Sequence, residues 1–123
     1  MTPELLLAPE LLPFLVGGVL LGIVVGAVPG LTATLAISLL LPLTYQLAPL
    51  PAIVMMTGIF TGGIYGGSIA AITLRMPGAP ASAMTMLDGY AMAQRGKAGS
   101  AIALATFSSF VGGIFGGVVL VLF

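Results

Sequence analysis

Residues 14–41 read FLVGGVLLGIVVGAVPGLTATLAISLLL and decide the fold. The segment has no charge and is apolar on all sides of a helix, as in a helix that faces lipid or other membrane helices. Pro29-Gly30 interrupts it, because proline lacks a backbone donor and glycine costs about 1 kcal/mol in a helix. Residues 14–28 and 31–41 are each shorter than the roughly 20 apolar residues that a crossing needs. The segment therefore predicts either one broken crossing or a hairpin that dips into the membrane.

The composition of the whole chain is that of a membrane protein. Of its 123 residues, 59% are hydrophobic and only 5% are charged, and the mean hydropathy is +1.27. A soluble domain has about 25% charged residues, and a chain this small cannot hide so much apolar surface in its own core. We therefore predict an all-α integral membrane protein in the lipid bilayer, built from glycine-rich packed transmembrane helices with broken or re-entrant segments.

The composition also excludes several classes of function. The chain has no Cys and no His, which rules out thiol catalysis and the usual zinc sites within it. Asp88 is the only aspartate, so no acid–base pair is available inside the membrane. The formal net charge is +0, and no basic patch marks a nucleic-acid partner. We expect no enzymatic activity, no catalytic residues, no cofactor and no nucleic-acid binding.

The rest of the chain divides into connections and crossings. Residues 1–13 contain three prolines and predict an interfacial lead-in, and 42–51 (PLTYQLAPLP) predict a turn. Residues 52–74 and 100–123 are each long enough to cross a bilayer. Residues 75–99 between them are amphipathic and hold most of the charges. The chain stops inside a hydrophobic run, which predicts a fragment of a longer protein.

Charges near the last crossing suggest an orientation. Arg95 and Lys97 lie in one short connection, and Lys and Arg favour the cytoplasmic side. Residues 88–97 then read as a solvated loop inside the cell, and the turn at 42–51 lies outside. The N-terminus is outside if residues 14–41 form a hairpin, and inside if they cross once.

Small residues recur every four positions in three helical segments, and such stripes let helix backbones approach closely in lipid. The stripes are Gly18, Gly22, Gly26 and Gly30; Gly58, Gly62, Gly66 and Ala70; and Ala101, Ala105, Ser109, Gly113 and Gly117. We expect them to pack helices together, so that Gly66→Leu or Gly113→Leu lowers the yield of folded protein. A structural membrane protein that oligomerises through such glycine-zipper helices is the alternative function.

The first helix break is a candidate binding site. A half-helix that restarts near Thr32 points its free amides and positive dipole end into the break at Pro29, Gly30 and Leu31. Thr32 and Thr34 add hydroxyl groups. The break therefore suits an anionic oxygen or, through the carbonyls of the preceding half-helix near Gly30, a Na⁺ ion. The alternative is a proline kink that serves packing only.

The second helix break resembles the first. Pro77-Gly78 is a turn signal, and Pro80 suits the first turn of a new helix. Ser82 and Thr85 are three residues apart near the start of that helix and share a face. Arg75, just before the break, is either part of a functional site or a side chain that extends to the membrane surface.

Motifs along nearly the whole chain resemble the large membrane subunit of the tripartite tricarboxylate transporters. They are the PGL motif at residues 29–31, LLP at 40–42, GGIYGGS at 62–68, P-G-x-P-A-S at 77–82, DGY at 88–90 and GKAG at 96–99. Two departures are Thr32-Ala33-Thr34, where the family often has glycine and proline, and Ala91 in place of a proline. Family members are several times longer, so residues 1–123 correspond to the N-terminal part.

The resemblance implies a multi-pass subunit of a secondary transporter in the inner membrane. It implies uptake of citrate-like or other carboxylates, driven by a Na⁺ or H⁺ gradient. The implied partners are a periplasmic solute-binding protein and a small membrane subunit. Two broken helices favour this reading over the structural alternative, because an oligomer of straight helices gains nothing from them.

We therefore predict that the two breaks face each other across a cavity and bind a substrate carboxylate mainly through backbone amides at the restarts near Thr32 and Ser82. The predicted substrate-binding residues are Pro29, Gly30, Leu31, Thr32, Thr34, Ser68, Pro77, Gly78, Pro80, Ser82 and Thr85.

Overall fold

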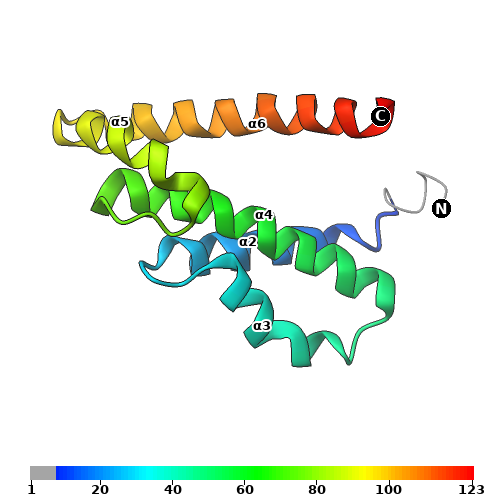
Figure 1. The fold of residues 1–123 in the computed structure, drawn as a ribbon. Helices are drawn as coiled ribbons and strands as arrows, with labels where there is room; N and C mark the ends of the chain where they lie inside the picture. The colour runs from blue at the N-terminus through cyan, green and yellow to red at the C-terminus, as the bar shows by residue number, and fades with distance from the viewer. Residues whose placement is uncertain (1–7) are drawn as a thin grey trace.

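The computed structural model describes residues 8–123, which form helices joined by short connections, with no strand among them. The elements are α2 (Leu12–Ala27), α3 (Ala33–Thr44), α4 (Pro49–Leu74), the short 3₁₀ helix η1 (Pro80–Ser82), α5 (Ala83–Gln94) and α6 (Ala98–Leu122) (Figure 1). The predicted all-α fold is confirmed. The expected lead-in at residues 1–13 lies mostly outside the described residues.

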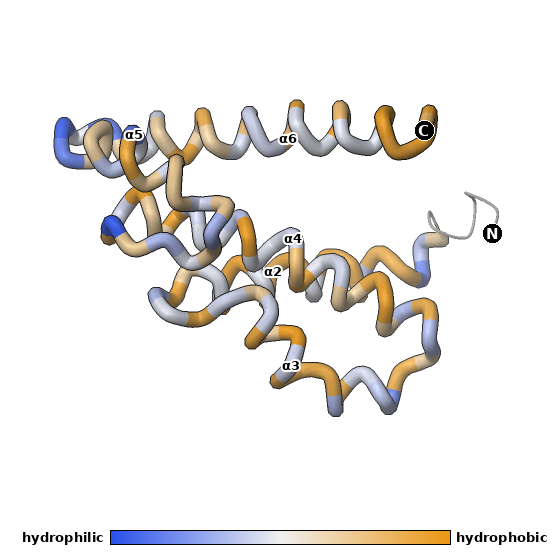
Figure 2. Tube along the Cα trace, in the orientation of Figure 1, coloured by the Kyte–Doolittle hydropathy of each residue, from blue (hydrophilic) through white to orange (hydrophobic). Residues whose placement is uncertain are grey.

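Two helices are long and apolar enough to cross a membrane. They are α4 with 26 residues and α6 with 25, whereas α2 and α3 are shorter apolar helices. Large apolar side chains cover the outside of the bundle, for example Leu39 at 70% exposure and Phe107 at 66%. Such a surface is what a membrane protein presents to lipid or to further membrane helices. Hydrophilic residues gather at one end, around the α5–α6 junction and the end of α4 (Figure 2).

Glycines hold α2 against α4 in backbone contact. A Cβ added at Gly18, Gly22 or Gly26 would collide with backbone atoms of Met55, Ile59 and Gly63, respectively. The contact is reciprocal, since a Cβ at Gly62 or Gly66 would collide with the carbonyls of Val19 and Ile23. Both sets of contacts advance along the two helices together, so α2 and α4 run in the same direction. The predicted packing role of these two stripes is confirmed except at Gly30, where an added Cβ would meet nothing within 4 Å.

The chain turns back after α2, so residues 14–41 form a hairpin and not a single broken crossing. Because α2 and α4 are parallel, α3, which connects them in the chain, has to run back in the opposite direction, as the cyan segment beside them in Figure 1 does. A Cβ on Gly63 would lie 2.7 Å from the Cβ of Ala33, at the start of α3. The tip of the hairpin therefore lies beside the middle of α4.

The predicted boundaries around Pro42 were wrong. The helix α3 was expected to end at Leu41, but it continues through Pro42 to Thr44. Pro42 is in the last turn, where the helix loses only one internal hydrogen bond. The expected turn at 42–51 is also shorter, because Pro49 opens α4 and Pro51 lies in its first turn. Amides at that end of a helix have no internal acceptor, so proline costs nothing there.

The segment after α4 folds back and becomes helical again. Gly78 packs against Gly67, and α5 then runs outward until Gly89 meets the side chain of Ile72. The expected solvated loop at 88–97 was wrong for most of its length, since Asp88 to Gln94 belong to α5. The helix α6 returns along α4, and the hydroxyl oxygens of Tyr65 and Thr106 lie 2.8 Å apart.

The third stripe of small residues does not pack within the described chain. Ala101 is the buried residue of α6, and a Cβ at Gly112, Gly113, Gly116 or Gly117 would meet nothing within 4 Å. Gly113 therefore has no helix against it inside residues 8–123, and its packing role stays a prediction for the full-length protein.

Two neighbouring glycines of α2 give a matched test of the backbone contact. Gly18→Ala places a Cβ on the carbonyl of Met55, whereas Gly17 has nothing within 4 Å. We expect Gly18→Ala to destabilise the fold by about 1–3 kcal/mol, as overpacking does. Gly17→Ala should be neutral or stabilising by up to about 1 kcal/mol, because alanine favours a helix. Thermal unfolding in detergent measures both, and equal effects would contradict the assigned contact.

Candidate functional site

The first break is a tight backbone turn between α2 and α3. The amide of Val28 donates to the carbonyl of Val25, and the amide of Leu31 donates to that of Val28. Gly30 has a φ of +88°, which residues with a Cβ rarely adopt. Pro29 and Leu31 are half-buried and Gly30 is exposed. The sequence Pro-Gly therefore ends one helix and reverses the chain within a few residues.

The first break restarts as a helix with a threonine cap. The Thr32 hydroxyl accepts a hydrogen bond from the Leu35 amide at 3.2 Å, so α3 begins at Ala33, within a residue of the predicted restart. The amides of Ala33 and Thr34 have no backbone acceptor in the described part of the chain. The Thr34 side chain is exposed. The tip thus presents two free amides at the positive end of a helix dipole.

The second break brings two serines together. Gly78 and Ser82 are buried, whereas Pro77 and Pro80 are exposed. Ser82 is only 1% exposed, and its hydroxyl oxygen lies 3.3 Å from that of Ser68 on α4. No buried side-chain oxygen or nitrogen of the described residues lacks a hydrogen-bond partner. The two serines thus satisfy each other at the start of α5.

The two breaks lie beside α4 about one turn apart, the first at Gly63 and the second at Gly67. A Cβ on Gly78 would lie 2.8 Å from the Cα of Gly67 and 2.9 Å from the carbonyl oxygen of Gly26. The expected arrangement was two breaks across a cavity. In the structure, the second break packs directly on the last turn of α2. The non-helical residues 28–32, which include Gly30 and Thr32, follow this contact after Ala27.

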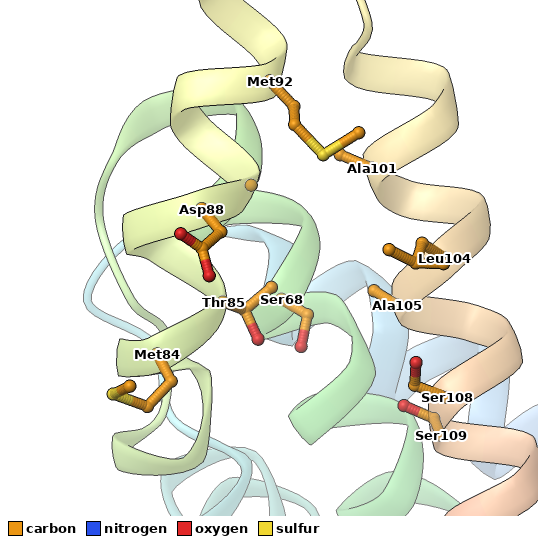
Figure 3. Close-up of a pocket in the computed structure, with 11 residues that line it drawn as sticks. Ser68, Met84, Thr85, Asp88, Met92, Ala101, Leu104, Ala105, Ser108 and Ser109 are labelled. Carbon is orange, nitrogen blue, oxygen red and sulfur yellow. The ribbon is translucent and has the colours of Figure 1, made fainter.

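A cavity of about 340 Å³ lies beside the second break, between α4, α5 and α6 (Figure 3). Two of the predicted site residues, Ser68 and Thr85, line it. Sequence reasoning missed three further polar residues in its wall, which are Asp88 on α5 and Ser108 and Ser109 on α6. The signal was present: Asp88 lies one turn after Thr85, and Ser108-Ser109 is a hydroxyl pair inside an apolar helix.

Arg75 lies outside this cavity. It ends α4 with a left-handed conformation, φ 56°, and its guanidinium carbon is 5.6 Å from the centroid of the Tyr90 ring. This distance is within cation–π range. No group of three or more His, Cys, Asp or Glu side chains among the described residues forms a metal site.

These features define a class of protein: an all-helical membrane protein in which two broken helices converge beside one long helix. More particularly, the chain belongs to the tripartite tricarboxylate transporter TctA family, whose model matches residues 12–123. This confirms the resemblance seen in the motifs.

A relative and the solved structures complete the comparison. Over 74 residues the chain is 46% identical to an uncharacterised 52.8 kDa protein in the TAR-I ttuC′ 3′ region of Agrobacterium vitis. The match covers 60% of this chain and 15% of that protein, so the chain spans a small part of its length. No solved structure matches the chain.

The cap at Thr32 can be tested against its neighbour. Thr32→Ala removes the acceptor of the Leu35 amide, and loss of such a cap costs about 1 kcal/mol. Thr34→Ala should have little effect, because the Thr34 hydroxyl bonds nothing within the described residues. Hydrogen exchange at the Leu35 amide should speed up only in Thr32→Ala. A similar increase in both variants would show that Thr32 does not cap α3.

Proposed function

We propose that this chain is the N-terminal part of the membrane subunit of a secondary active transporter for tricarboxylates or related carboxylates. Membership of the TctA family supports the transporter class. The convergence of the two breaks beside α4 is the structural observation that supports a substrate site in this part of the subunit.

The position of the breaks supports a carrier site. Gly63 is eleven residues before Leu74, so the contact with Ala33 lies roughly 16 Å from that end of α4 at 1.5 Å per residue. If α4 crosses the bilayer, the first break enters the membrane from one side and the second break enters it from the other. Both breaks then lie near the centre of the bilayer. Irregular backbone at that depth is tolerated only when it is buried in protein or lines a cavity. Carriers place their discontinuous helices at the midplane for this reason.

A substrate carboxylate would bind chiefly at the start of α3. The free amides of Ala33 and Thr34 and the positive helix end favour an anionic oxygen, and Pro29, Gly30 and Leu31 shape the turn in front of them. The Thr32 hydroxyl can still donate while its oxygen caps the helix. Across the contact at Gly26, the tip formed by Pro77, Gly78 and Pro80 completes the site, and Ser68, Ser82 and Thr85 supply hydroxyls behind it.

The partners follow from the family description. A tripartite system implies a solute-binding protein that delivers the carboxylate from the periplasm and a small membrane subunit, with an ion gradient as the driving force. In the inner membrane, Arg95 and Lys97 would lie on the cytoplasmic side. The hairpin in residues 14–41 would then put the N-terminus outside. The resulting subunit is multi-pass and has no enzymatic activity.

The alternative function, assembly through glycine-zipper helices, draws on one observation. The glycines at positions 112, 113, 116 and 117 of α6 are exposed, and such small residues favour helix association. Helix association alone, however, leaves the two breaks and the serine pair without a role.

Uptake by the full-length transporter distinguishes backbone from side-chain recognition. Gly78→Val forces side-chain atoms onto Gly67 and Gly26, and we expect it to abolish carboxylate uptake at matched expression. Ser82→Ala removes one neutral hydrogen bond, worth about 0.5–1.5 kcal/mol, and should reduce uptake less than about tenfold. Ala91→Val on the exposed face of α5 serves as a control for added bulk.

The assay uses proteoliposomes with the cognate solute-binding protein, the small subunit and labelled citrate. Normal uptake by Gly78→Val together with no uptake by Ser82→Ala would replace the backbone model with a side-chain site. Failure of the wild-type complex to accumulate any di- or tricarboxylate under Na⁺ or H⁺ gradients would refute the proposed function.

A further inference from the structure

The cavity between α4, α5 and α6 gathers oxygen atoms from three helices. Ser68 comes from α4, Thr85 and Asp88 from α5, and Ser108 and Ser109 from α6. Figure 3 shows Asp88, Thr85 and Ser68 on one wall and the two serines of α6 on the other. The remaining lining residues are methionine, leucine, alanine and glycine. A carboxylate and four hydroxyls therefore line one open cavity, in which Ser68 and Thr85 are half-buried and Asp88, Ser108 and Ser109 are exposed.

The charge of this cavity is negative. Asp88 is the only charged residue that lines it, and Arg75, which follows α4, lies over the Tyr90 ring instead. An unpaired carboxylate in a partly apolar space repels anions and attracts cations. The cavity is therefore unsuited to the carboxylate substrate.

We propose that this cavity binds a monovalent metal cation of the Na⁺ type, with Asp88 as the charged ligand and hydroxyls of Ser68, Thr85, Ser108 and Ser109 as neutral ligands. One carboxylate matches a single positive charge. Calcium sites usually combine several carboxylates, and transition metals prefer imidazole or thiolate ligands, which this chain lacks. A proton carrier would need the carboxylate but not hydroxyls from three helices.

The cavity is connected to the second break through a hydroxyl pair. Ser68 lines the cavity, and its oxygen lies 3.3 Å from that of Ser82 at the start of α5. A cation that draws Ser68 and Thr85 together would hold α5 against α4. It would thereby keep Gly78 in contact with Gly26, in the last turn of α2. The cation site rests on the proposed function only for this coupling role, in which bound cation favours the substrate-binding arrangement.

The direct test is binding of radioactive sodium to the purified full-length transporter in detergent. Asp88→Asn keeps the shape of the side chain and removes its charge. We expect at least about tenfold weaker sodium binding, because bonds to a charged group are worth about 1.5–3 kcal/mol. Thr85→Val and Ser109→Ala should each weaken it by about two- to tenfold. Glu10→Gln, an exposed carboxylate before α2, is the matched control and should bind like wild type.

Gel filtration confirms that each variant is folded before binding is compared. If Asp88→Asn does not fold, sodium binding by Thr85→Val and Ser109→Ala provides the test. Unchanged sodium binding in the folded variants would overturn the proposal, as would stronger binding of Ca²⁺ than of Na⁺. Uptake driven by a proton gradient with no sodium binding would also overturn it, and would leave the proposed transport function intact. Sodium binding that depends on Asp88 in a protein that transports no carboxylate would support the site and refute the transport function.

Discussion

The backbone contact between α2 and α4 is the interaction on which the rest of the structure depends. In lipid, apolar side chains gain nothing by leaving the solvent, so helices associate where their backbones can approach closely. Glycines on both helices provide this at Gly18, Gly22 and Gly26 against Met55 to Gly63. The contact makes the two helices parallel, and α3 must then return along them. A hairpin tip beside the middle of α4 is the direct consequence.

The absence of side chains on glycines also explains how the second break packs against the end of α2, beside the first break. Gly78 can touch Gly67 and Gly26 because none of the three has a side chain. Ser82 follows and finds the Ser68 hydroxyl, so its own hydroxyl is paired although it is buried. Two chain reversals that would each expose unpaired backbone to lipid thus shield each other. This is the condition under which irregular backbone persists at membrane depth.

The sequence predicted the helices, the two breaks and the packing stripes of α2 and α4, because each follows from a local rule about proline, glycine or apolar length. It did not predict features that depend on tertiary neighbours. Pro42 continues α3 because it falls in a last turn, and α5 lies against α4 where Gly89 contacts the side chain of Ile72. Asp88 lines the cavity because α6 lies opposite α5, and the sequence around Asp88 does not predict that arrangement. Gly113 has the same spacing as Gly66 but no facing helix within the described residues.

The arrangement keeps opposite charges on separate hairpins. The start of α3 offers amides and a positive dipole end, whereas the α5 cavity offers a carboxylate. If both ligands shared one cavity, the protein's own charged groups would neutralise each other and neither ligand would be needed for stability. Separate sites joined by Gly26, Gly78 and the Ser68–Ser82 pair avoid this. In the proposed transporter, each ligand would offset a different local charge, and the contact of Gly78 with Gly26 would let one occupied site favour the geometry of the other. Coupling would then depend on close backbone packing and not on an ion pair between the two ligands.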